Sequence, residues 1–164
     1  MDARTETACP VLGLAHVAIK AADLPATIAF YRQALGLIEL PRPPFGFPGA
    51  WLGAPDGEAL LHLYGGARAR DADGGAPVGG AAIDHVSLWA RGHEAQRARF
   101  EALGLPYRSQ PVPATNLAQL FVYDPNGVLL ELTYRLADEP GAVVGQRGGA
   151  LRFEPQRYAR FGVR

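Results

Sequence analysis

Short runs in which apolar and polar residues alternate recur along the chain, as half-buried strands require. Four of these runs contain a histidine or a carboxylate among their apolar residues: His16 in LAHVAIK, His62 in ALLHLYG, His85 in IDHVSLW and Glu131 in VLLELTY. His16 and His62 are 46 residues apart, and so are His85 and Glu131. The repeated spacing predicts two similar modules, each of which offers two polar side chains on its strands.

The first half of the chain predicts a strand, a helix and a hairpin in that order. Residues 12–20 alternate as a strand does. Asp23 suits the N-cap of a helix that Gly36 would end. The turn sequence Ala-Pro-Asp-Gly at 54–57 then joins two strand-like runs, and the second of these runs carries His62.

The second half predicts the same order of elements. The run IDHVSLW predicts a strand, and residues 92–103 predict a helix. The runs 117–123 and 128–134 predict two strands, joined by the strong hairpin turn Asp-Pro-Asn-Gly at 124–127. Glu131 lies in the last of these strands.

These patterns divide the chain into five parts. A chain of 164 residues, 48% of them hydrophobic, is long enough to bury one good core but short for two, so one composite domain is expected. Its expected parts are an N-terminal arm 1–11, a first module 12–64, a Gly- and Ala-rich linker 65–81, a second module 82–135 and a C-terminal tail 136–164.

The charge balance favours a small molecule as the partner. Lys and Arg together number 16, and so do Asp and Glu, which gives no reason to expect binding to nucleic acid or to an anionic membrane. Cys9 is the one cysteine, which excludes an internal disulfide framework and fits a reducing cytoplasm. No apolar run approaches the roughly 20 residues that span a bilayer, and the polar start MDARTETA does not resemble a signal peptide. A cytoplasmic location is expected.

The four polar groups on the predicted strands point to a metal site. A buried carboxylate without a partner costs several kcal/mol, so Glu131 needs a reason to lie in such a strand. A divalent cation shared with His16, His62 and His85 supplies one, because imidazole and carboxylate together suit Zn, Ni, Mn or Fe(II). The alternative is a buried network of hydrogen-bonded histidine and glutamate side chains.

Other polar and aromatic residues are candidates for contact with a substrate. Gln119 shares a face with Phe121 on the predicted strand, where it would bind a ligand, a substrate or solvent. Tyr64 and Trp51 would line the site or pack at its rim. His93 lies on a helix that is expected to face solvent, and it is interpreted as a surface residue.

The ordered set of motifs resembles the vicinal oxygen chelate superfamily, which includes glyoxalases, bleomycin resistance proteins and extradiol dioxygenases. The motifs are Leu14-x-His16-Val17 before the helix, His85-Val86, and the segment DPNGVLLEL. The resemblance covers most of residues 12–134. It implies an α+β fold in which two βαβββ modules form a cupped, half-barrel mixed sheet around one cation.

The resemblance also maps the four polar groups onto the ligand positions of this superfamily. His16, His85 and Glu131 match directly, whereas the position of His62 holds different residue types in different branches. If His62 binds the metal, the site has three histidines and a glutamate. If it does not, the other three form a facial triad and His62 would serve as an acid or base beside it.

The implied chemistry is that of a metal-dependent enzyme on a small oxygen-bearing substrate, most simply a glyoxalase-like lyase or isomerase. Its base would be Glu131 if this residue can leave the metal, and otherwise His62 or a bound hydroxide. Two alternatives stay open: an Fe(II) extradiol dioxygenase, and an antibiotic-resistance protein that binds a drug or transfers a thiol to it. A homodimer is expected because a partner would cover the sheet edges. The modules would pair within one chain or between two chains.

Overall fold

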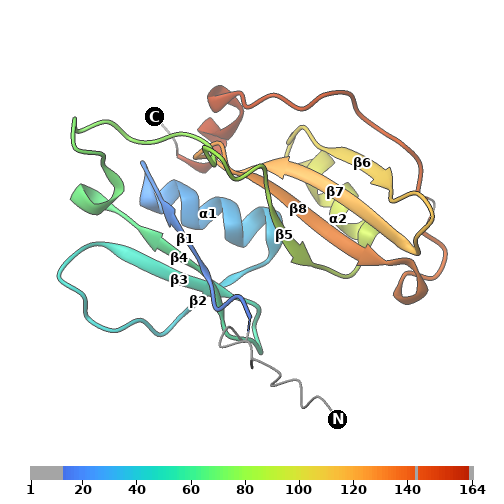
Figure 1. The fold of residues 1–164 in the computed structure, drawn as a ribbon, viewed down its shortest axis with the longest axis horizontal. Helices are drawn as coiled ribbons and strands as arrows, with labels where there is room; N and C mark the ends of the chain where they lie inside the picture. Colours follow the sequence, from blue (N-terminus) through green and yellow to red (C-terminus); the bar gives the residue numbers. More distant parts are fainter. Residues whose placement is uncertain (1–12, 143, 163–164) are drawn as a thin grey trace, which may run out of the picture.

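Two four-stranded mixed sheets form the framework of the protein (Figure 1). The computed structural model describes residues 13–142 and 144–162. The elements of the first sheet are β1 (Val17–Lys20), α1 (Leu24–Leu35), β2 (Ile38–Leu40), β3 (Gly49–Gly53) and β4 (Ala59–Tyr64). Those of the second sheet are β5 (Val86–Trp89), α2 (His93–Ala102), β6 (Arg108–Pro111), β7 (Leu117–Tyr123) and β8 (Leu129–Arg135).

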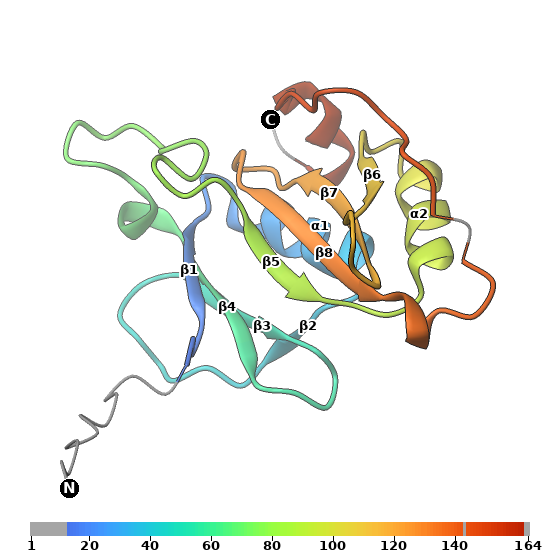
Figure 2. The ribbon, with the colours of Figure 1, turned by 45° about the vertical axis from the view of Figure 1, so that its right-hand side comes forward.

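The two sheets have the same topology. Their strand orders are β1-β4-β3-β2 and β5-β8-β7-β6, so the first and last strands of each unit are hydrogen-bonded neighbours. The pairs β1–β4 and β5–β8 are parallel, and the other pairs are antiparallel. Neither sheet closes on itself, and the helices α1 and α2 lie on one side of the sheets (Figure 2). This is the predicted α+β arrangement of two βαβββ units.

Helix α1 begins and ends at the predicted residues. The Asp23 carboxylate accepts a hydrogen bond from the backbone N–H of Ala26 at 2.9 Å, which satisfies one of the free donors of the first turn. Gly36 ends the helix with φ of 72°, a conformation that glycine adopts without strain.

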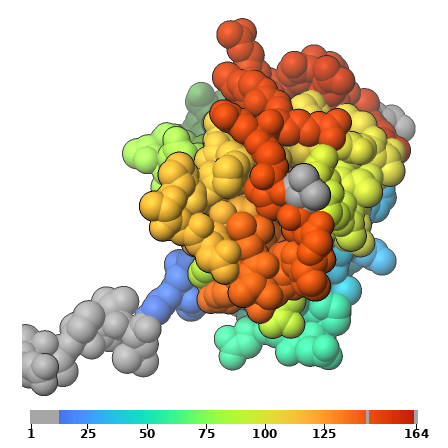
Figure 3. Space-filling view, turned by 90° about the vertical axis from the view of Figure 1, so that its right-hand side faces the viewer, coloured from blue at the N-terminus to red at the C-terminus, as the bar shows by residue number. Residues whose placement is uncertain are grey.

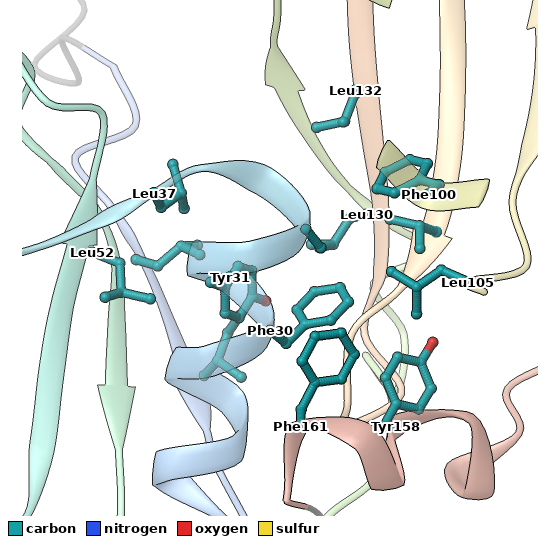
Figure 4. Close-up of a cluster of buried hydrophobic side chains, with 14 of the residues drawn as sticks. Phe30, Tyr31, Leu37, Leu52, Phe100, Leu105, Leu130, Leu132, Tyr158 and Phe161 are labelled. Atoms are coloured by element: carbon teal, nitrogen blue, oxygen red, sulfur yellow. The ribbon is translucent and has the colours of Figure 1, made fainter. Parts of the chain in front are cut away.

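A single hydrophobic core joins the two sheets (Figure 4). Phe30 and Tyr31 of α1 are fully buried between Leu52 of the first sheet and Leu130 of the second. The rings of Tyr158 and Phe161 pack edge-on against Phe30, at centroid distances of 5.8 and 5.5 Å. The two units therefore depend on each other for burial of their apolar faces.

The C-terminal segment supplies part of this core. It contains two 3-10 helices, Leu136–Asp138 and Pro155–Phe161, and the second carries the two aromatic rings against Phe30. Figure 3 shows the chain after β8 crossing the surface over α2 and β6. Arg147 forms a β-bridge with Ser109 of β6 there, and its guanidinium lies 2.9 Å from the Glu101 carboxylate.

Several boundaries differ from the sequence predictions. The first strand begins at Val17 and not at residue 12, so His16 precedes it, and His85 likewise precedes β5. Both strands are edge strands with one hydrogen-bonded neighbour, so their first residues have fewer backbone partners to hold them in a ladder. The linker contains an unexpected 3-10 helix at Gly66–Ala69. The expected arm 1–11 lies outside the described residues, and no described helix is long and apolar enough to cross a bilayer.

Candidate functional site

His62 and Glu131 lie on the sheet faces that point away from the helices, and His16 and His85, which precede β1 and β5, lie beside them. Alternation along β4 directs Leu61 and Leu63 into the core and His62 to the opposite side. Along β8, Leu130 and Leu132 enter the core, and Glu131 points away from it. Each sheet therefore presents a polar group on its uncovered face.

His16 and His62 form one of two pairs. Their rings stack at a centroid distance of 3.7 Å with an interplanar angle of 19°. Trp51, the cross-strand partner of His62 on β3, stacks on the other side of the His62 ring at 4.3 Å and 8°. His62 is thus held between an indole and a second imidazole, which restricts the directions that its two nitrogens can face.

The surroundings of His62 favour its neutral form. Burial lowers the pKa of His62, and the positive charges of His16 and Arg42 lower it further. The imidazole can therefore accept a proton or a metal ion at a pH where an ordinary histidine would be partly protonated.

His85 and Glu131 form the second pair. His85 Nε2 lies 3.3 Å from Glu131 Oε2, and His85 Nδ1 lies 2.7 Å from an Asp84 carboxylate oxygen. The Glu131 side chain is only 7% exposed, whereas that of His85 is 34% exposed. An imidazole that meets a carboxylate on each side is oriented by both of them.

Two hydroxyl groups hold the other oxygen of Glu131. Ser87 and Thr133 donate hydrogen bonds to Glu131 Oε1 at 2.7 and 2.6 Å, and their own oxygens are 3.0 Å apart. Ser87 is the parallel partner of Glu131 on β5, and Thr133 follows it by two residues on the same face of β8. These bonds satisfy the buried carboxylate and direct Oε2 toward His85.

The expected substrate-contacting residues divide between the two sheets. Gln119 pairs with Thr133 across β7 and β8, so it shares the face of Glu131, and its amide oxygen accepts a hydrogen bond from Gln110 at 3.1 Å. Tyr64 follows His62 by two residues on β4, and its ring meets that of Phe47 edge-on at 5.5 Å. Tyr64 and Trp51 therefore belong to the first sheet, whereas Gln119 belongs to the second.

The family model described as Glyoxalase/Bleomycin resistance protein/Dioxygenase superfamily matches residues 13–132. The chain belongs to this superfamily. It is also called the vicinal oxygen chelate superfamily, and its members typically bind a divalent metal. No curated protein matches the chain.

Solved structures of the glyoxalase superfamily share its fold. Lactoylglutathione lyase from Agrobacterium tumefaciens is 24% identical with a TM-score of 0.57, over 82% of this chain and 100% of that one. The fosfomycin resistance protein FosX from Listeria monocytogenes is 16% identical with a TM-score of 0.56, over 76% and 93%. TnmS3, an antibiotic binding protein from Streptomyces sp. CB03234, is 14% identical with a TM-score of 0.57, over 77% and 98%. At these identities the likeness concerns the fold alone.

The donor types of the four candidate residues suit a divalent metal, but one chain holds them as two separate pairs. Within residues 13–142 and 144–162, no three His, Cys, Asp or Glu side chains gather as a metal site requires. The stacked rings of His16 and His62 add a constraint. A metal lies in the plane of each imidazole at about 2.0–2.1 Å from its nitrogen, and two nearly parallel planes do not meet within that distance. In these orientations, only one of the two rings can bind a given metal ion.

The expectation for His93 is wrong. Its side chain is completely buried at the start of α2, where Nδ1 lies 3.1 Å from a Glu94 oxygen and the ring meets Tyr134 edge-on at 5.1 Å. Tyr134 lies on the core side of β8, opposite to Glu131. The two rings therefore do not contribute to the face that carries the candidate site.

Sequence reasoning also missed the groups around Glu131. Thr133 follows Glu131 by two residues in an alternating strand, so the sequence alone indicates that the two side chains share a face. Ser87 shares a predicted face with His85 by the same rule. Arg108 of β6 also lies on this face, as the partner of Phe121 on β7. Placing Arg108 next to Glu131 requires the pairing register of β6, β7 and β8, and the sequence alone does not give that register.

Proposed function

We propose that this protein is a divalent-metal-dependent enzyme that acts on a small oxygen-bearing substrate, with glyoxalase-like lyase or isomerase chemistry. The observation that carries the proposal is the His85–Glu131 pair, in which an imidazole nitrogen and a buried, hydroxyl-braced carboxylate oxygen lie 3.3 Å apart. Membership of the glyoxalase superfamily supports it. A cytoplasmic location stays a prediction.

His85, Glu131 and His16 are the proposed metal ligands, and His62 is a fourth ligand or a base beside them. A divalent cation at this position would supply Lewis-acid stabilisation of negative charge on the substrate oxygens. The stacked geometry favours the second role for His62, because its ring and that of His16 cannot bind one ion together in these orientations. Burial, His16 and Arg42 lower the pKa of His62, which favours the neutral form that a base must have.

The catalytic base would remove a proton beside a substrate carbonyl. His62 is one candidate, and Glu131 is the other. Glu131 Oε1 already accepts two hydroxyl hydrogen bonds, which leaves Oε2, beside His85, as the oxygen that would take a proton if Glu131 leaves the metal. Ser87 and Thr133 would hold the carboxylate in place during that transfer.

We further propose that the complete site forms between two copies of the chain. The support is that His16 lies apart from the His85–Glu131 pair in one chain, while both groups are on faces without helices. In a homodimer, His16 of one copy would complete the pair on the other copy.

A complementation experiment tests this arrangement. His16→Ala and Glu131→Ala chains, each inactive alone, are unfolded and refolded together and then assayed for bound metal. A site shared between chains restores one intact site in each mixed dimer, whereas sites within single chains give no recovery. A Glu101→Ala chain is a suitable control, since its carboxylate pairs with Arg147 at the surface.

The reaction class is tested with the metal-loaded protein. Exchange of the proton beside the carbonyl of a hemithioacetal of methylglyoxal and glutathione, followed by NMR in deuterated water, is the expected result for a lyase or isomerase. Oxygen uptake with catechols in the Fe(II)-loaded protein would instead establish the extradiol dioxygenase alternative.

A second candidate function is the binding of an aromatic antibiotic. The observation that favours it is the aromatic surface of the first sheet, where Trp51 stacks on His62 and lies 6.2 Å from the ring of Phe45. The Arg42 guanidinium lies over the rings of Phe45 and Phe47, at 4.7 and 4.9 Å. Such a surface could stack on a planar ligand without metal, and tight binding of an aromatic drug by metal-free protein would support it. Thiol transfer to a drug is the remaining alternative of this class.

A further inference from the structure

A row of side chains crosses the second sheet beside the proposed metal ligands. Arg108 on β6 pairs with Phe121 on β7, Phe121 pairs with Glu131 on β8, and Glu131 pairs with Ser87 on β5. Cross-strand partners point to the same side of a sheet. The four side chains therefore share the face that carries the His85–Glu131 pair.

Arg108 extends along this row toward Glu131. Its guanidinium carbon lies 4.3 Å from the centre of the Phe121 ring, so the charged group is over β7 and next to β8. The ring of Phe121 is also near His85, whose ring is edge-on to it at 5.9 Å. Phe121 is only 4% exposed beneath these groups.

The Arg108 guanidinium has no anionic partner in the part of the chain that the structure describes. No carboxylate there lies within ion-pair distance of it, and its Nε is buried without a hydrogen-bond acceptor. By contrast, the arginines Arg97 and Arg157 pair with Glu94 and Glu154, both at 2.8 Å. A buried N–H without an acceptor and a half-buried cation without an anion both cost free energy, and an anionic ligand would remove that cost.

We propose that Arg108 binds an oxyanion group, a carboxylate or a phosphoryl or phosphonyl group, on the substrate of the site. This inference rests on the proposed function, since it places the rest of the substrate at the His85–Glu131 pair. The planar guanidinium can donate two parallel hydrogen bonds to such a group. Adjacent strands lie about 4.8 Å apart, so the anionic group and the oxygens near Glu131 must be only a few bonds from each other. The substrate class is a small oxygenated acid.

Gln119 can add a neutral donor to the same ligand. It lies in the next row of the face, paired with Thr133. Its amide oxygen is used by the hydrogen bond from Gln110, and that bond does not use its own NH₂ group. An oxyanion between Arg108 and this row would therefore meet a charged donor on one side and an amide donor on the other.

The experiment measures binding of inorganic phosphate and of acetate by calorimetry at constant ionic strength, with the full chain as purified and again after chelator treatment. Wild-type protein is expected to bind at least one of the two anions, with or without metal. Arg108→Gln should weaken that binding about 10-fold or more. Arg108→Lys keeps the charge but lacks the two parallel donors of the guanidinium, so its anion affinity should lie between those of wild type and Arg108→Gln. Preference for phosphate or acetate identifies the kind of oxyanion.

Arg135→Gln is the matched control. Arg135 lies on the same face of β8, and its guanidinium stacks at 3.9 Å over Trp89, so the substitution removes an equal charge outside the row. It should leave anion binding unchanged. Equal binding by wild type and Arg108→Gln, or no binding of either anion by wild type, would overturn the inference. Metal content measured on the same samples keeps this outcome separate from failure of the metal proposal.

Discussion

The hydroxyl of Tyr31 donates a hydrogen bond to Asp124 Oδ2 at 2.9 Å, which links the helix of the first unit to the hairpin turn of the second. Both residues are completely buried. Asp124 also accepts bonds from the backbone N–H groups of Asn126 and Val128, and the Asn126 side chain bonds back to the first unit at Ala22 and Thr27. The Asp-Pro-Asn-Gly turn thus joins the two units as well as two strands.

Substitution at this link should destabilise the fold without touching the candidate site. Tyr31→Phe removes one donor from a buried carboxylate and should lower the free energy of unfolding by about 1–3 kcal/mol. Burial raises the pKa of Asp124, and the bonds from Val128, Asn126 and Tyr31 oppose that rise, so loss of the hydroxyl should raise this pKa further. Urea unfolding measures the change, with metal content as the control that should stay the same.

The hydroxyl groups around Glu131 should tune metal binding. In Ser87→Ala or Thr133→Val, Glu131 Oε1 loses one of its two hydroxyl donors, and metal affinity should fall about 10-fold to 100-fold. Competition with a chelator of known affinity gives the measurement. Thr115→Val is a control, because that hydroxyl bonds to the Val112 carbonyl at an exposed turn. Unchanged affinity in both site variants would mean that Glu131 is not a ligand.

His62 should titrate below an ordinary histidine in the metal-free protein. Burial, His16 and Arg42 all lower the pKa of His62 from its usual 6.5. Because the pKa of His62 is depressed in the folded protein, the unfolded chain binds this proton more tightly, so protonation of His62 opposes folding as the pH falls below its unfolded pKa, and this cost is absent above that pKa. NMR titration of the imidazole protons should show the low value, and Arg42→Gln or His16→Ala should move it back toward 6.5. A value unaffected by either substitution would contradict this electrostatic explanation.

The stacked pair predicts different outcomes for its two histidines. His16→Ala should lose bound metal, whereas His62→Ala should keep metal and lose turnover, because one ring of the stack can bind a given ion. Elemental analysis and an activity assay on the same samples separate the two effects. Loss of metal from His62→Ala with retention in His16→Ala would reverse the assignment.

Much of the fold could be predicted from local signals. Asp23, Gly36 and the two Asp-Gly or Asn-Gly hairpin turns act through neighbouring backbone groups, so their positions could be identified from sequence. The short strands β2 and β6 have no pattern of their own, because three or four residues are too few to show alternation. His93 was misinterpreted for a related reason. Its burial comes from contact with Tyr134, 41 positions further along the chain, and not from the polarity of its helix.

The candidate site was only partly predictable. The 46-residue spacing identified the four polar groups and, through strand alternation, the sheet face of each. It could not show that His16 stacks on His62, that two hydroxyls hold Glu131, or that Arg108 reaches over Phe121. Those relations depend on rotamers and on the register between strands, which are set by the packed core.

The central claim is that Glu131 and His85 hold a divalent metal. The most direct measurement is elemental mass spectrometry of wild-type and Glu131→Gln protein, purified without chelator and without an affinity tag that releases nickel. We predict about one Zn, Ni, Mn or Fe per wild-type chain and none in the folded variant, which keeps the shape of the side chain but loses its charge. A wild-type protein that contains no metal and takes up none on titration would contradict the claim, as would a variant that retains the full amount.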